Sequence, residues 1–247
     1  MTVAPVMTMA PRMRLHLLDA VAGMHPTDAA VRCLALAYPE LPDPAGLPLG
    51  QRDAALLGLR ARLLGDRLVA WTSCDSCGEQ STLELSVAEL LEQMGARTEK
   101  RWVLQHQGDP LPVRALTSRD LARAAGAPSP EEARDLLVAA ALDQVTEPQD
   151  APPLDDELAA AVAASLAEHD PGSEVLLAGS CAVCGEQWSH MLDPARYVVA
   201  ELAHLGARLL AEVAELARAF GWTEADVLAL SDQRRRAYLE LASEMTG

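Results

Sequence analysis

The 247-residue sequence has few aromatic residues, few positive charges and no long uncharged stretch. Its longest segments without a charged side chain, 1–11 and 175–185, are far shorter than the roughly 18 to 20 residues that a membrane-spanning helix needs. The first ten residues have neither a basic region nor a continuous apolar run, so they do not resemble a secretory signal. We therefore expect a cytoplasmic protein without a membrane span.

Positive charge is scarce, because 20 Lys and Arg stand against 36 Asp and Glu, a formal net charge of −16. Residues 135–195 contain no Lys or Arg at all. Such a surface repels phosphate, and the single basic run, residues 234–236, is interpreted as a solvated helix face. Aromatic residues make up only 3% of the chain, too few for a base-stacking platform, so we do not expect nucleic-acid binding.

Four of the five cysteines lie in two matching octets, 73–80 and 180–187, that both read Ser-Cys-x-x-Cys-Gly-Glu-Gln. The match continues outward in the same register, where the helix cap Ser86 aligns with the helix cap Asp193. Each unit predicts a strand, a knuckle, a returning strand and a helix. A chain of this length can bury a sizeable core without disulfides, so the cysteines need another explanation.

The spacing of these cysteines suits a metal ion. Two intervening residues let both sulfurs point into one turn, and the following glycine can adopt a positive φ that directs backbone N–H groups at the thiolates. Two facing knuckles supply four sulfurs at about 2.3 Å from a tetrahedral Zn²⁺. We predict one structural zinc ion per chain, with these ligands: Cys74, Cys77, Cys181 and Cys184. A four-thiolate site leaves no open position for water or substrate, which argues against hydrolytic chemistry.

Other interpretations of the cysteines stay open. A dithiol oxidoreductase would place a thiolate at a helix N-terminus or beside a cation, and neither octet is followed at once by a helix or flanked by Lys or Arg. The cysteines could also simply pack. Cys33 is expected to be a small buried residue, and His190 is a weaker ligand candidate because the four-cysteine set is complete. No phosphate loop, nucleophile elbow or catalytic triad pattern is present, so we expect no enzymatic activity.

Hydrophobic spacing and helix caps predict a mostly helical α+β fold with a small β-hairpin zinc ribbon that is split in the sequence. The stretch through Pro26 has no clear period, and we interpret it as an arm that leads into a helix. Leucine spacing predicts a helix over 51–64 that ends at Gly65. A hairpin is expected over 101–116, with its turn at 108–110.

The C-terminal third predicts an unusually long helix, with Asp193 as N-cap, Pro194 as its first residue and an end near Phe220. Its apolar residues recur every three or four positions and form one stripe: Val198, Leu202, Leu205, Leu209, Val213, Leu216 and Phe220. Burial of such a stripe would contribute on the order of 10 to 20 kcal/mol before chain entropy is subtracted, so we expect this helix to be the spine of the fold.

We divide the chain into four regions. They are an N-terminal arm and helix (1–46), a helix with the first knuckle (47–92), an inserted hairpin and helical region (93–172), and the second knuckle with the long C-terminal helical region (173–247).

Three blocks of the sequence are distinctive beyond their chemistry. They are Leu-Pro-Leu-Gly-Gln-Arg-Asp-Ala at 47–54, the two cysteine octets, and 220–241, which contains Phe-Gly-Trp-Thr-Glu, Leu-Ala-Leu-Ser and Arg-Arg-Arg-Ala-Tyr-Leu-Glu-Leu. Over roughly residues 47–242 the chain resembles the base plate (hub) protein family of contractile-tailed phages and extracellular contractile injection systems, of the T-even type. The resemblance implies a non-enzymatic protein that helps to build the base plate, and some members act as assembly factors.

The sequence therefore predicts a structural or assembly protein of a phage-like contractile tail or injection-system base plate, located in the cytoplasm or in the contractile particle. Its expected partners are other base plate or hub proteins, with residues 234–236 and the C-terminal helices as candidate contact surfaces. Neither nucleic acid nor a small-molecule substrate is expected. The alternative function is that of a zinc-containing thiol redox sensor or holdase, whose thiolates would respond to oxidant.

Overall fold

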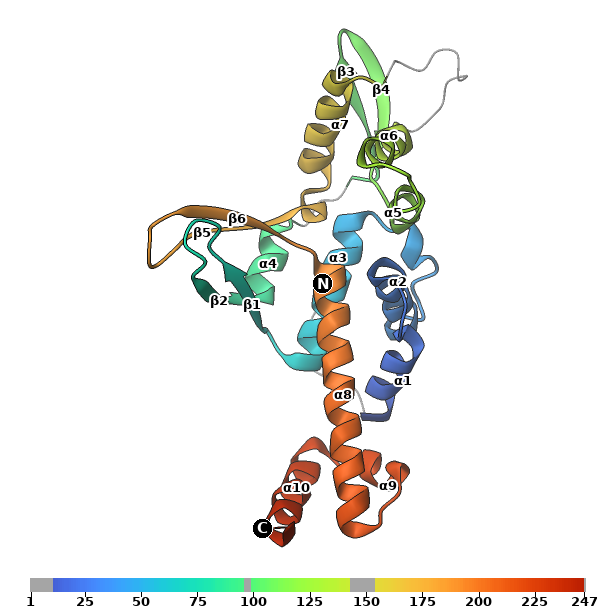
Figure 1. The fold of residues 1–247 in the computed structure, drawn as a ribbon. Coiled ribbons are helices and arrows are strands. Elements are labelled where there is room, and N and C mark those ends of the chain that lie inside the picture. Colours follow the sequence, from blue (N-terminus) through green and yellow to red (C-terminus); the bar gives the residue numbers. More distant parts are fainter. Residues whose placement is uncertain (1–10, 96–98, 143–153, 247) are drawn as a thin grey trace.

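The computed structural model describes residues 11–95, 99–142 and 154–246. Within them the chain is mostly helical with small antiparallel hairpins, so the predicted α+β class is confirmed (Figure 1). The α-helices are α1 (Pro11–Val21), α2 (Pro26–Ala37), α3 (Leu49–Leu64), α4 (Val87–Gln93), α5 (Ser118–Ala124), α6 (Pro130–Ala141), α7 (Asp156–His169), α8 (Pro194–Phe220), α9 (Glu224–Ala229) and α10 (Asp232–Thr246). The 3₁₀ helices are η1 (Pro44–Gly46) and η2 (Pro171–Ser173). The strands are β1 (Arg67–Ser73), β2 (Gln80–Ser86), β3 (Arg101–His106), β4 (Asp109–Arg114), β5 (Val175–Ser180) and β6 (Gln187–Leu192).

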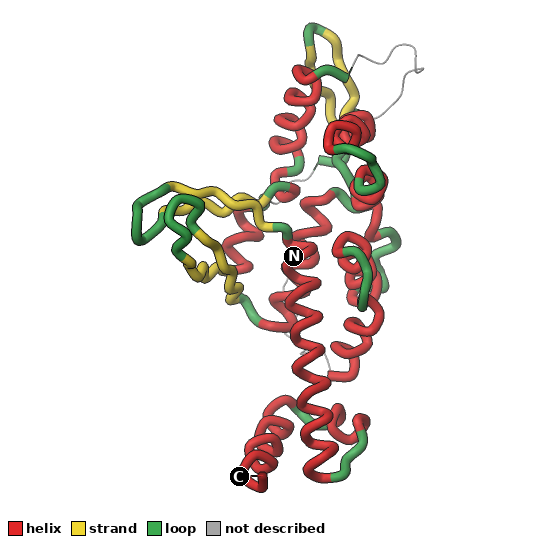
Figure 2. The backbone as a smooth tube through the Cα atoms, viewed as in Figure 1, coloured by secondary structure: helices red, strands yellow, loops and turns green. Residues whose placement is uncertain are grey.

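The strands of the described residues form three antiparallel hairpins, each a two-stranded sheet of its own: β1–β2, β3–β4 and β5–β6. Figure 2 shows the first and third together on one side of the molecule. These two hairpins have the same register, since the pair Leu68–Leu85 of the first corresponds to the pair Val175–Leu192 of the third when the octets are aligned. The predicted order of strand, knuckle, strand and helix is therefore observed twice.

The main core lies where α2, α3 and α8 meet the bases of the two related hairpins. Its fully buried side chains include Leu34 of α2, Leu56 of α3 and Val198 of α8. The equivalent residues Leu68 and Val175 enter the same core from β1 and β5. Both hairpins are thus anchored to the helices at the end opposite their knuckles.

Helix α8 is the predicted spine and runs from the middle of the molecule to its lower end in Figure 1. The expected cap Asp193 and first residue Pro194 are both confirmed, and Gly221 ends the helix in a left-handed conformation with φ 68°. Five residues of the predicted apolar stripe are buried, while Leu205 and Phe220 are partly buried. The helix packs against α1, α2, α3 and α10, which is why so long an element stays attached along its length.

A second core joins β3–β4 to α6 and α7, above the main core in Figure 1. Val113 and Val162 are buried there. The indole N–H of Trp102 donates to the hydroxyl of Ser165 at 2.6 Å, and its ring stacks on His169 with centroids 4.5 Å apart. These contacts fix α7 against the hairpin.

The C-terminal corner is built from α1, the end of α8 and the helices α9 and α10. Leu15 and Leu216 are buried within it. Three aromatic rings pack together at its edge with centroids 4.7 to 5.8 Å apart: Phe220, Trp222 and Tyr238. The last block of the family resemblance therefore coincides with a packed aromatic corner.

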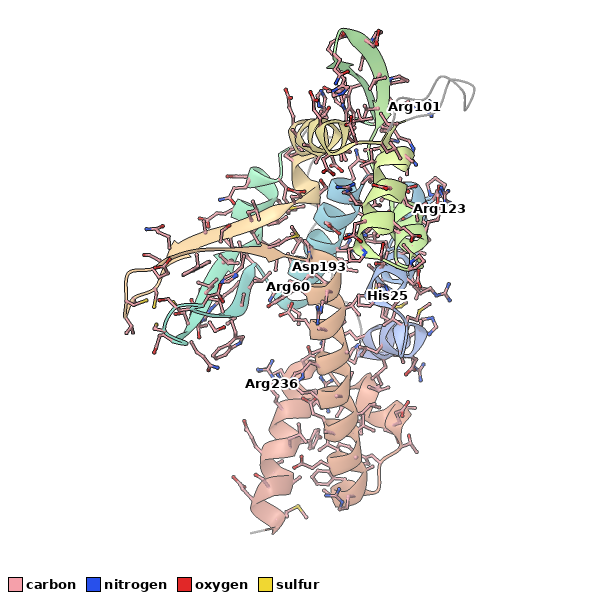
Figure 3. The ribbon with its side chains drawn as sticks, turned by 45° about the horizontal axis from the view of Figure 1, so that its top comes forward. His25, Arg60, Arg101, Arg123, Asp193 and Arg236 are labelled. Atoms are coloured by element: carbon pink, nitrogen blue, oxygen red, sulfur yellow. The ribbon has the colours of Figure 1, made fainter. Side chains whose placement is uncertain are left out.

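The basic run 234–236 is not uniformly solvated. Arg235 is buried and pairs with Glu212 of α8 at 2.6 Å and with Asp232 at 3.0 Å. Arg234 and Arg236 are exposed, the latter at the start of α10 in Figure 3. The prediction of a solvated face is correct for these two residues and wrong for Arg235, because every third or fourth residue of a docked helix must face its neighbour.

The N-terminal stretch through Pro26 contains a helix, α1, where the sequence analysis expected an arm. Leu17 is buried, and Leu18 packs so closely on α8 that a Cβ at Gly206 would lie 2.1 Å from its Cδ1. The arm prediction is wrong for residues 11–21, because the helix is stabilised by this docking rather than by a strong local period. Residues 1–10 lie outside the described residues.

The turn of the β3–β4 hairpin is displaced from its predicted position at 108–110. It is formed by Gln107 and Gly108, with φ values of 52° and 95°, and Asp109 and Pro110 already belong to β4. Two consecutive positive φ values are typical of the two-residue turn whose twist matches that of the flanking strands.

The first block of the resemblance forms the buried start of α3. The backbone N–H of Gly50 donates to Asp170 Oδ2 at 3.1 Å, and a Cβ at Gly50 would lie 2.9 Å from the carbonyl carbon of Gly172. Arg52 Nε and Nη2 donate to Asp53 at 2.7 and 3.0 Å. Burial raises the pKa of Asp53 to about 6 although Arg52 opposes this shift.

Candidate metal centre

The two knuckles have the same backbone geometry. In the first, the N–H of Cys74 donates to the carbonyl of Glu79, and the N–H of Gly78 donates to the carbonyl of Cys74, both at 2.8 Å. The equivalent bonds around Cys181 measure 2.8 and 2.9 Å. Gly78 and Gly185 both have φ 75°, a conformation that other residues rarely adopt. The repeated glycine therefore serves the closure of each turn.

The structure brings the two cysteine pairs together, as the sequence predicts. The sulfurs of Cys74, Cys77, Cys181 and Cys184 all lie within 4.8 Å of one another. Two close approaches cross between the knuckles, with the sulfurs of Cys74 and Cys184 and those of Cys77 and Cys181 both 3.6 Å apart. Four sulfurs around one tetrahedral ion with 2.3 Å bonds would be separated by about 3.8 Å. The cluster has the size of a site for one metal ion.

The cross-knuckle distances also show a local two-fold relation. Alignment of the two octets exchanges Cys74 with Cys181 and Cys77 with Cys184, so the pair Cys74–Cys184 becomes Cys181–Cys77. Both pairs measure 3.6 Å, as this symmetry requires. Each knuckle contributes equally to the cluster.

The four cysteines differ in exposure. The first cysteine of each pair is buried, with exposed fractions of 6% for Cys74 and 4% for Cys181. The second of each pair, Cys77 and Cys184, is exposed. The first cysteine of each pair is thus covered by the protein, and the second lies at the surface.

Hydrogen bonds from backbone N–H groups of the knuckles favour the thiolate form of the cysteines and so act to lower their pKa values. The N–H groups of Cys184 and Val183 lower the pKa of Cys181 to about 7. The N–H of Glu79 acts in the same direction on Cys77, but hydrogen bonds with the neighbouring cysteines and desolvation outweigh it and raise the pKa of Cys77 to about 12. Sulfurs this close cannot all ionise together unless a cation shares the site, which is what a thiolate-bound metal ion provides.

Interactions that the sequence did not predict position the first hairpin against the helices. The hydroxyl of Tyr197 in α8 donates to the carbonyl of Val69 in β1 at 2.7 Å. Arg60 of α3, labelled in Figure 3, donates to both carboxylate oxygens of Glu201 at 2.8 and 3.0 Å, and to the carbonyl of Gly65 at 2.6 Å. The bonds of Tyr197 with Val69 and of Arg60 with Glu201 join residues more than 100 positions apart, so no local sequence pattern predicts them.

The weaker sequence candidates lie outside the cluster. Cys33 is fully buried in the main core, and burial raises its pKa to about 11, as expected for a packed thiol. His190 pairs with Leu177 and stacks on Trp188, with centroids 5.2 Å apart. It lies three residue pairs from the knuckle end of the hairpin, about 10 Å along the strand, and so cannot reach the sulfurs.

Comparison with known proteins gives no further assignment. The chain matches no protein-family model, no curated protein and no solved structure. Among the described helices, none combines the length and the apolar character needed to cross a membrane.

Proposed function

We propose that the four cysteines bind one structural Zn²⁺ and that the chain is a non-enzymatic structural or assembly protein. The observation that carries the zinc proposal is the convergence of four sulfurs from two distant segments, all within 4.8 Å of one another. Thiolates select zinc, copper(I) or iron–sulfur clusters. Sulfurs within 4.8 Å of one another can surround a single ion but leave no room for a cluster with bridging sulfides, which favours zinc.

Metal analysis of the purified chain tests the zinc proposal directly. We expect about one zinc per chain, lost in Cys184→Ala and kept in the matched control Cys33→Ala, whose thiol lies in the main core. A protein without metal, or one that keeps its zinc after Cys184→Ala, would contradict the proposal. One iron per chain in place of zinc would retain the site and correct the metal.

We further propose that the protein acts in the base plate of a phage-like contractile tail or injection system. The support is the sequence resemblance, and the positions that carry it have structural roles. Gly50 packs against Gly172, the octets build the cysteine cluster, and Trp222 belongs to the aromatic corner. A shared fold would retain such positions, because substitution there disturbs packing directly.

Co-purification tests the base plate proposal. The chain, expressed with a tag from its own operon, should recover neighbouring hub or wedge proteins. A chain with a disruptive substitution in the aromatic corner, Trp222→Ala, serves as a comparison for contacts made through the C-terminal helices. Recovery of no tail protein under conditions that keep the chain soluble would exclude the proposed role.

A redox sensor or holdase is the second candidate, and the exposure of Cys77 and Cys184 favours it. An oxidant could reach these sulfurs, convert two thiolates to a disulfide and release the metal. Zinc that resists mild peroxide supports the structural role, whereas rapid zinc release with loss of two thiols per disulfide supports sensing. Thiol titration and zinc release measured on the same sample separate the two functions.

A further inference from the structure

A groove of about 830 Å³ lies between α6, α7 and the start of α3, away from the cysteine cluster. Helix α6 lines it with one face, at positions i, i+3, i+4, i+7 and i+8: Pro130, Ala133, Arg134, Leu137 and Val138. This is the spacing of the stripe by which an amphipathic helix packs on a neighbour. The stripe of α6 is therefore only partly used by the contacts within the chain.

Helix α7 forms the opposite wall, and its lining residues are small. Val162 is buried at the floor of the groove, whereas Ala160 and Ala163 are exposed. The lining of α7 extends from Asp156 to Leu166, about 15 Å at 1.5 Å per residue. Three alanines, Ala159, Ala160 and Ala163, form the middle of this wall and leave space for the larger side chains of another helix.

The groove is surrounded by negative charge. Residues 130–142 and 154–174, which contain both helices, carry nine Asp and Glu and a single Arg or Lys, Arg134. That arginine is already neutralised by Asp135 and Asp156, at 3.1 and 2.6 Å. Glu174 is exposed at the far end of the lining. A ligand in the groove lies within a Debye length, about 10 Å at 0.1 M salt, of several carboxylates.

We propose that the α6–α7 groove binds an amphipathic helix of a partner protein, with large apolar side chains on one face and Lys or Arg beside them. Apolar contact in the groove supplies the affinity, and the surrounding carboxylates select a basic partner over an acidic one. The groove shares no residue with the cysteine cluster, so this inference does not depend on the metal or on the base plate proposal.

Three synthetic peptides of about 14 residues test the groove on the full chain by titration calorimetry. The first has Leu at i, i+3, i+4 and i+7 and Lys elsewhere, the second has Glu in place of Lys, and the third is a scrambled form of the first. We expect saturable one-to-one binding of the first, at least tenfold tighter than the others and weakened by salt. Equal binding of the first and third peptides, or none at all, would overturn the proposal.

A matched pair of variants locates the binding. Ala163 lines the groove, and Ala164 is the next residue of α7, exposed but not part of the lining. Ala163→Arg places a bulky cation in the groove and should weaken the Leu/Lys peptide at least tenfold, whereas Ala164→Arg should change it less than twofold. Both variants keep an exposed helical site, so both should fold. Equal effects of the two would show that the peptide binds elsewhere.

Two other occupants are distinguished by further measurements. A dimer in sedimentation equilibrium that dissociates in Ala163→Arg, and not in Ala164→Arg, would assign the groove to a second copy of the chain. A variant without residues 1–10 that binds the Leu/Lys peptide at least tenfold more tightly would assign it to the N-terminal segment of the chain itself. Either result would overturn the proposed partner helix.

Discussion

Removal of the proposed zinc ion should open the knuckle ends of the two related hairpins and leave the main core folded. The backbone ladders do not join β1–β2 to β5–β6, because each hairpin is a separate two-stranded sheet. Leu68, Val175 and Leu192, at the opposite ends of the hairpins, are buried with the helices of the main core. The knuckles therefore depend on the sulfur cluster, whereas the bases depend on apolar packing.

The expected change in the opening equilibrium of the knuckles follows from the linkage between zinc binding and closure of the ribbon. An ion that binds only the closed ribbon stabilises it by about 4 kcal/mol when free zinc is about 1,000 times its dissociation constant, or about 1,000-fold in the opening equilibrium. The knuckle N–H groups of Cys74, Gly78, Cys181 and Gly185 report this opening, since their carbonyl partners lie within the knuckles. Their hydrogen exchange should accelerate by about that factor after chelation, as it should in Cys184→Ser.

Amides of the main core provide the internal control. Leu56 and Leu57 of α3 and Leu202 of α8 are buried, and their exchange should change less than about twofold when zinc is chelated. Cys33→Ala should keep the exchange of its knuckle amides sensitive to chelation. If chelation accelerates the exchange of the core amides as much as that of the knuckle amides, the metal stabilises the whole fold and the prediction is wrong. Unchanged knuckle amides would show that packing alone closes the ribbon.

Two further predictions concern the polar and glycine positions of the helices. Gly50→Ala should lower the free energy of unfolding by about 1 to 3 kcal/mol, since its Cβ would lie 2.2 Å from Asp170 Oδ1. Gly58→Ala in the same helix, with no atom within 4 Å, should raise it by about 0.5 to 1 kcal/mol; thermal denaturation of both variants checks the opposite signs. Burial acts to raise the pKa of Asp120, but Arg114 at 2.8 Å and its capping bonds hold that pKa below its usual value. Its stabilisation is therefore present above about pH 4 and decreases as the pH falls toward the lower folded pKa, so Asp120→Asn should destabilise at pH 7 and progressively less as the pH is lowered below about 4, measured by urea unfolding.

The sequence alone predicts the helix caps, the knuckle glycines and the matching hairpins of the chain. The caps Ser86 and Asp193 accept bonds from backbone N–H groups three residues later, as their positions before periodic segments predict. The glycines after the second cysteines have the expected positive φ. The constant offset between the two repeat units predicts matching hairpins, and the expectation of one shared metal site predicts that their knuckles meet. The caps and glycines depend on residues a few positions away, and the repeat is recognised by comparing two segments of the sequence, so none of these signals needs knowledge of the rest of the fold.

The sequence does not predict elements and ion pairs that depend on residues far away in the chain. Helix α1 has a weak period of its own, and its position is set by the close approach of Leu18 to Gly206, which lies near the other end of the sequence. The bidentate pair of Arg60 and Glu201 joins α3 to α8 across 141 residues. Each partner alone resembles an ordinary surface charge in the sequence. Only the packing of the two helices makes them a partly buried pair.

In the C-terminal basic run, contacts within the fold decide which arginines are available to a partner protein. In the sequence, the run of three arginines is a candidate contact surface, but Arg235 pairs with Glu212 and Asp232 within the chain. Removing Arg235 would take this cation from the partly buried Glu212, whereas Asp232 would keep Arg14 at 3.0 Å, so the change disturbs the fold rather than a partner. Arg234 and Arg236 are the exposed members, so a contact through this helix would have to involve these two. The α6–α7 groove has the opposite character, because its apolar lining is not covered by the described residues and the charge around it is predominantly negative.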